Sequence, residues 1–115
     1  MTTGEFQRMA LSLPEVEERA HMGHPDFRVG GKIFATLFDP SKGIGMVKLT
    51  LEQQRIYIQA DPKVFVPAQG AWGTGGSTLV HLKHANAETV AETVKEALRA
   101  AWAGGARVSK RKPKP

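Results

Sequence analysis

Four histidines, arranged as two pairs, are the residues of this sequence best suited to metal binding or proton transfer. His21 and His24 are three residues apart in a segment that we expect to be extended, so their side chains would point to opposite faces if both lay in one strand. His81 and His84 lie where another strand is expected to end. The acids at positions 15–18 are too few to form an acidic ridge, and neither pair has a carboxylate cluster beside it. We therefore expect no metal site.

Catalysis by other familiar side-chain arrangements is also not expected. The sequence contains no cysteine, which excludes disulfides, thiol catalysis and cysteine-based zinc sites. It contains no serine, histidine and acid at a spacing that supports hydrolytic catalysis. We expect a protein without enzymatic activity and without a cofactor.

A glycine-rich segment at residues 70–77 has the composition of a phosphate-binding loop but not its context. A phosphate loop opens a helix, whose N-terminal amides point at the anion, whereas this segment runs into a predicted strand and no lysine follows the glycines. We therefore predict a flexible loop. For Trp72, a lid over the edge of the core is favoured over a platform for stacking bases.

The net charge of +5 comes from 16 basic and 11 acidic residues and is concentrated at the C-terminus. Residues 107–115 contain no acid and carry five cations: Arg107, Lys110, Arg111, Lys112 and Lys114. Removing these five leaves 11 basic residues, equal in number to the acids, so the preceding part of the chain sums to zero. We predict a basic mobile tail at 107–115 after a domain at 1–106.

Four further cations lie on or beside a predicted hairpin and the turn that follows it: Arg28, Lys32, Lys42 and Lys48. Projecting loops with this composition are able to contact a phosphate backbone. Asp26 and Asp39 lie among them, which reduces the local excess to two charges. An ordinary solvated surface therefore stays an alternative to a nucleic-acid surface.

Three helices are expected to position these residues. Thr2 and Glu5 form a capping-box pattern at the start of a helix over 2–13. Thr50 and Gln53 form a second such pattern before a helix over 51–60. The apolar stripe of residues 87–103 predicts the last helix, which ends at two glycines.

Gly30 and Gly31 predict a tight hairpin turn, because both glycines adopt positive φ easily. The resulting register pairs Val29 with Lys32, Arg28 with Ile33, and Phe27 with Phe34. One face of the hairpin would then be a core face, formed by Phe27, Val29, Phe34 and Phe38. The other would be mixed, formed by Asp26, Arg28, Ile33, Ala35 and Leu37.

The remaining strands are predicted at 16–22, where the strand lies at an edge, at 45–49 and at 78–82, with residues 66–77 irregular. The order of elements indicates a single-domain α+β fold, an antiparallel sheet with the N- and C-terminal helices packed on one face. The side chains expected to be buried are Phe6, Met9, Phe27, Phe34, Tyr57, Ile58, Phe65, Val94 and Leu98.

Several segments resemble the MmcQ/YjbR-like proteins: LPEVEE at 13–18, GHPDFRVGGKIFA at 23–35, VKL at 47–49, TLEQQ at 50–54, VPAQGAWG at 66–73 and TLVHL at 78–82. The resemblance extends from about Phe6 to Trp102 and rests on the order and spacing of these segments. It implies a fold similar to the bacterial frataxin homologues and DNA binding through a "double wing" of two projecting β-loops. It implies no catalytic residues, and it does not cover the basic tail.

Two functions follow as expectations. The favoured one is a small DNA-binding module that makes weak, largely non-specific contacts to duplex phosphates through its hairpin loops and tail. The alternative is an accessory domain that binds a protein or a small ligand on an open sheet face near Trp72 and His81. No apolar run approaches the roughly 18 residues of a membrane span, and the N-terminus does not resemble a signal segment. We expect a cytoplasmic monomer.

Overall fold

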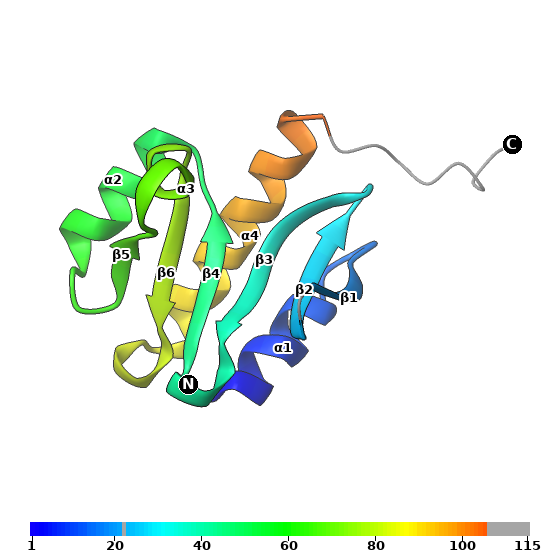
Figure 1. Cartoon of the computed structure of the whole chain (residues 1–115), viewed down its shortest axis with the longest axis horizontal. Helices are drawn as coiled ribbons and strands as arrows, with labels where there is room; N and C mark the ends of the chain where they lie inside the picture. Colours follow the sequence, from blue (N-terminus) through cyan, green and yellow to red (C-terminus); the bar gives the residue numbers. More distant parts are fainter. Residues whose placement is uncertain (22, 106–115) are drawn as a thin grey trace, which may run out of the picture.

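An antiparallel sheet of six strands organises residues 1–21 and 23–105, which the computed structural model describes (Figure 1). The strands lie in the order β1-β2-β3-β4-β6-β5 across the sheet. Their bounds are β1 Glu17–His21, β2 His24–Val29, β3 Lys32–Asp39, β4 Ile44–Lys48, β5 Phe65–Pro67 and β6 Ser77–His81. The predicted α+β class is confirmed. The tail predicted at 107–115 lies outside the described residues.

The helices are α1 Thr3–Leu11, α2 Leu51–Ala60, α3 Gly70–Thr74 and α4 Ala87–Ala103, with short 3₁₀ turns at Pro40–Lys42 and Leu82–His84. Both predicted capping boxes are confirmed, one at Thr2 and one at Thr50. In each box the threonine hydroxyl accepts from the third helical amide, and the third side chain accepts from the threonine amide. No helix in the described part of the chain has the length and apolar character needed to cross a membrane.

The terminal helices α1 and α4 pack on the same face of the sheet, as predicted, and α4 crosses behind β3 and β4 in Figure 1. Phe6 of α1 and Phe27 of β2 meet edge to face, with ring centroids 6.2 Å apart. Most of the predicted core side chains are fully buried, but Met9 and Leu98 are only partly covered. Tyr57 and Ile58 of α2 are also partly buried, because α2 lies beside β5 rather than over the centre of the sheet.

A β-bulge between β2 and β3 corrects the predicted register. The two-glycine turn and its first two pairs, Val29 with Lys32 and Arg28 with Ile33, are confirmed. Phe27 then pairs with Ala35 instead of Phe34, because one extra residue of β3 is inserted at this point.

The insertion moves every later side chain of β3 to the opposite face. Ala35 and Leu37 are therefore buried in the core, although they were predicted on the mixed face. Phe38, predicted in the core, is 39% exposed on the other side. A second irregularity, between Thr36 and Asp39, affects the pairing of β3 with β4.

Residues 66–77 are also more ordered than predicted, since they contain most of β5 and the short helix α3. Two of their glycines are required for packing. A Cβ on Gly73 would overlap the carbonyl oxygen of Ala68, and a Cβ on Gly76 would overlap that of Leu49. The glycines of this segment therefore allow backbone segments to pack closely, and their presence is explained without a bound phosphate.

A buried amide holds this segment in place. The Nε2 atom of Gln54, on α2, donates to the carbonyl oxygens of Gly73 and Ser77 and to the hydroxyl of Thr78, at 3.0 Å, 3.2 Å and 3.1 Å. Gln54 is 8% exposed. Because a buried amide needs such partners, these hydrogen bonds tie α2 to the segment that contains α3 and the start of β6.

Candidate binding surfaces

The face of the sheet away from α1 and α4 contains a shallow hollow of about 530 Å³. Side chains from β2, β3, β4, β6 and α3 line it. The apolar ones are Ile33, Phe38, Met46 and Trp72, and they dominate its surface. We call this surface the open-face hollow.

Trp72 is 69% exposed at the open-face hollow, so it is not the lid over the core that the sequence suggested. Its helix, α3, is linked to β6 through Gln54, which donates to the carbonyl oxygens of Gly73 in α3 and Ser77 in β6. His81, the other residue predicted on this face, pairs with Ile44 and shares a sheet face with Met46, but it does not line the hollow. The bulge that brings Phe38 here leaves no clear sequence signal, which is why Phe38 was assigned to the core.

The polar groups at the hollow are mostly engaged by neighbours. Asp26 is 1% exposed and receives both Nε and Nη2 of Arg28, at 2.9 Å and 3.1 Å. The hydrogen bond to Asp26 raises the pKa of the Arg28 guanidinium above its ordinary value. His24 approaches the carbonyl oxygen of Phe38 through Nδ1 at 2.7 Å. Because a carbonyl oxygen only accepts, Nδ1 carries the hydrogen of this contact.

The four cations predicted around the hairpin do not form one patch. Arg28 is paired with Asp26, and Lys32 donates through Nζ to the carbonyl oxygen of Gly104 at 2.7 Å, beyond the end of α4. Lys48 lines the open-face hollow. Lys42 lies in the turn after β3, and the hairpin turn lies before β3, so the two turns are at opposite ends of that strand.

The five tail cations, Arg107, Lys110, Arg111, Lys112 and Lys114, lie outside the described residues. Among the side chains that the structure describes, which do not include that of His21, no three histidine or acidic groups gather in a way that would hold a metal ion.

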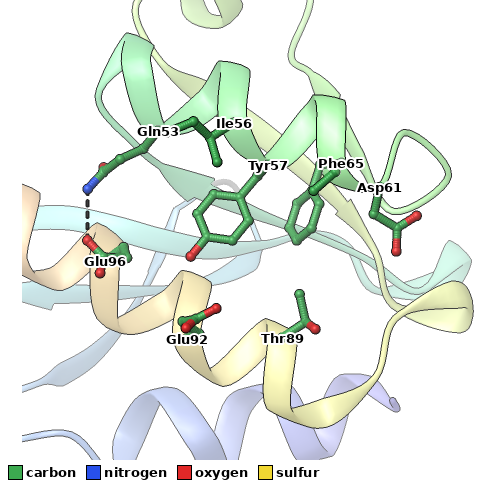
Figure 2. A pocket seen from close by; sticks show the side chains of 9 residues that line it. Gln53, Ile56, Tyr57, Asp61, Phe65, Thr89, Glu92 and Glu96 are labelled. Atoms are coloured by element: carbon green, nitrogen blue, oxygen red, sulfur yellow. Dashed lines mark hydrogen bonds between the residues drawn. The ribbon is translucent and has the colours of Figure 1, made fainter.

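A second concavity, which the sequence analysis missed, lies between α2 and α4 and has a volume of about 610 Å³ (Figure 2). Tyr57 and Phe65 form its apolar floor, with ring centroids 5.1 Å apart. Three carboxylates line it as well: Asp61, Glu92 and Glu96. We call it the acidic groove. The spacing of Glu92 and Glu96, one helical turn apart, was a signal that both point to one side of α4.

The carboxylates of the acidic groove are unequally engaged. Glu96 accepts from Nε2 of Gln53 at 2.8 Å and from Nη1 of Arg99 at 2.6 Å (Figure 2 draws the first of these). Asp61 and Glu92 make no ion pair with any residue that the structure describes. Partial burial raises the pKa of the Tyr57 hydroxyl, a shift that the hydrogen bond with Thr93 opposes.

Comparison with known proteins gives the fold and the family. The crystal structure of the Deinococcus radiodurans protein DR2400, described as a DUF419 domain, is similar with a TM-score of 0.78 at 18% sequence identity. The similarity covers 96% of this chain and 83% of that one, and at this identity it supports the fold alone. No curated protein matches the chain. The profile of the YjbR family matches residues 11–103, and the chain therefore belongs to the YjbR family.

Proposed function

We propose that this YjbR-family domain is a non-catalytic binding module whose ligand occupies the open-face hollow. The observation that carries the proposal is the joint exposure of two aromatic side chains there, Trp72 at 69% and Phe38 at 39%. Exposed aromatic side chains that line one concavity are typical of binding surfaces, and a volume of 530 Å³ lies in the range of small-ligand sites.

The lining favours a flat apolar ligand that carries one negative group. Trp72, Phe38 and Met46 provide apolar and aromatic contact area. Arg28 is occupied by the buried carboxylate of Asp26, so Lys48 is the lining cation with its charge available to a ligand. A planar aromatic anion therefore matches the site better than a cation or a sugar.

Anilinonaphthalene sulfonate, an aromatic anion with its own fluorescence, is a suitable probe. In a fluorescence titration, Trp72→Ala should weaken its binding about tenfold through the loss of aromatic contact. Lys48→Gln should weaken it less and should reduce its dependence on salt. Ile56→Ala is the matched control, because Ile56 is 55% exposed but lines the acidic groove. Unchanged binding by Trp72→Ala, or an equal loss in Ile56→Ala, would rule out the open-face hollow as the site.

Binding of duplex DNA is a second candidate, and the five cations within residues 107–115 favour it. The experiment is a salt titration of binding to random duplex DNA, because each lost phosphate contact lowers the log–log salt slope by roughly 0.9. Deletion of 107–115 should remove most of the salt-dependent affinity. A chain with Arg28, Lys32, Lys42 and Lys48 replaced by alanine should lose less.

Two results of the salt titration would contradict this assignment. If the deleted chain binds as well as the intact one and the four-alanine chain does not bind, the folded body contacts DNA. If none of the three chains binds, the DNA candidate is excluded. The open-face proposal does not depend on either result, since its probe is not a nucleic acid.

A further inference from the structure

We propose that the acidic groove between α2 and α4 is the docking site of the chain's own C-terminal segment, residues 106–115. The inference rests on the charge of the groove, its apolar floor, and the distance from the end of α4. It does not depend on the ligand of the open-face hollow.

The charges of the two parties are complementary. Asp61, Glu92 and Glu96 line the groove, and among the described residues no lysine or arginine lines it. Arg99 neutralises part of Glu96 from outside, which leaves the groove with an excess of two negative charges. The C-terminal segment carries five positive charges and no negative side chain. Opposite potentials of this kind favour one docked register and disfavour acidic competitors.

The floor of the groove suits lysine and arginine side chains in particular. Tyr57 and Phe65 provide aromatic faces, and Ile56 is 55% exposed at the rim (Figure 2). The long aliphatic stems of lysine and arginine pack on such surfaces while their charged ends reach carboxylates. A cation over the face of the Tyr57 ring gains a further cation–π attraction.

The segment is long enough to reach the groove. Helix α4 ends at Ala103, and Glu92 lies about 17 Å back along its axis at 1.5 Å per residue. Ten residues of extended chain span about 33 Å. Gly105 has a φ of +112°, a conformation that lets the chain change direction at the point where the segment begins. Ala103, Arg99, Glu96 and Glu92 share one stripe of α4, so the path back to the groove follows a helix surface.

Docking would occupy the cations that make the segment attractive to other anions. The acidic groove would then compete with any polyanionic partner of residues 107–115, including the duplex DNA considered above. An anion would have to displace the segment before binding it, which gives the groove a regulatory role.

The absence of native cysteine allows a direct test in the full-length chain. Ser109→Cys provides one attachment point for a nitroxide spin label, which broadens the amide signals of nearby residues. At low salt, the signals of Ile56, Tyr57 and Glu92 should lose most of their intensity, and those of Thr36 and Leu79 on the opposite side of the sheet should keep theirs. In about 1 M salt, where the Debye length is about 3 Å, the groove signals should recover.

The matched variants separate the groove from general electrostatics. Glu92→Gln with Glu96→Gln should abolish the broadening at the groove. Glu17→Gln with Glu18→Gln removes the same charge from exposed positions of β1 and should leave the broadening unchanged.

Three outcomes would overturn the proposal. The first is broadening confined to the last turn of α4, which tethering alone produces. The second is broadening that survives the groove substitutions. The third is broadening of an isotope-labelled chain by a separate spin-labelled chain in a mixture, which would assign the groove to the segment of another copy.

Discussion

Both faces of the sheet carry aromatic side chains, but the two faces differ in how far these side chains are buried. On the face covered by α1 and α4, Phe27 and Phe34 are fully buried. On the other face, Phe38 and Trp72 border a hollow, and they are 39% and 69% exposed. Phe34 and Phe38 belong to the same strand, four residues apart, and the irregular pairing of β3 gives them different surroundings.

This difference separates stability from binding. An aromatic side chain buried between helices and sheet contributes its whole transfer free energy to folding. One that is exposed in the folded state contributes much less, and its contact area stays available to a ligand. The covered face should therefore be sensitive to truncation in unfolding experiments, and the open face should be sensitive in binding experiments.

The largest difference in stability is expected between alanine substitutions of two phenylalanines, one on each face of the sheet. Phe27→Ala should lower the free energy of unfolding by about 3–5 kcal/mol, since it leaves a cavity against Phe6. Phe38→Ala should lower it by less than about 1 kcal/mol, while weakening the binding of anilinonaphthalene sulfonate. Urea unfolding followed by circular dichroism measures both. Equal destabilisation by the two substitutions would show that Phe38 is part of the core.

A smaller loss of stability is expected when the buried side-chain amide of Gln54, which binds the helix of Trp72, is removed. Gln54→Leu removes the donor for Gly73, Ser77 and Thr78 and leaves buried oxygens without it. The free energy of unfolding should fall by about 2 kcal/mol, because the hydrogen bonds of a buried amide are lost, although the carbonyl oxygens of Gly73 and Ser77 each keep a backbone donor. Glu52→Gln, an exposed change on the same helix, should alter it by less than about 0.5 kcal/mol. If Gln54→Leu is neutral in urea unfolding, the buried amide has no stabilising role.

The pair between Arg28 and Asp26 should have an intermediate effect, because the carboxylate is buried and the guanidinium side chain is 27% exposed. Arg28→Gln should destabilise the protein by about 1–3 kcal/mol, since it leaves Asp26 without its charged partner. Adding Asp26→Asn should restore part of the loss, as a double-mutant cycle would measure. Additive losses would mean that the two charges do not interact. Because Arg28 contributes to stability, any loss of DNA binding by an Arg28 variant has to be accompanied by a test that the variant is folded.

The sequence predicted the helices, strands and turns more completely than it predicted which face of the sheet each side chain occupies. Capping boxes and glycine turns are local signals, so α1, α2 and the hairpin were found from a few residues each. The bulge depends on packing across strands, and a single inserted residue reversed the assignments of Ala35, Leu37 and Phe38.

The candidate surfaces were partly predictable for a similar reason. Trp72 was singled out on its residue type, but its exposure depends on how α3 packs in the folded chain. The acidic groove joins residues from α2, β5 and α4, which are separated in sequence by up to about 40 positions. The cations around the hairpin looked equivalent in the sequence, but folding gives Arg28, Lys32 and Lys48 different surroundings.

The smallest effect is expected at Glu5, whose cap supports the first turn of α1 on the covered face. The backbone N–H of Thr2 donates to the Glu5 carboxylate at 2.8 Å, and this hydrogen bond holds the pKa of Glu5 below its ordinary value. A depressed pKa means that the folded state favours the ionised form. The resulting stabilisation is complete above the unfolded-state pKa, near 4.3 for glutamate, and it disappears as the pH falls through the lower folded-state pKa.

Glu5→Gln keeps an acceptor oxygen but removes the charge, so it should lower the urea midpoint slightly at neutral pH. The difference between the two proteins should shrink as the pH is lowered from about 5 to about 3, because Glu5 of the unmodified chain then becomes neutral as well. Urea midpoints measured across this range, with a carboxyl NMR titration of Glu5, test the sign directly. A difference that stays constant with pH would show that the charge of Glu5 does not contribute, and that the cap acts through geometry alone.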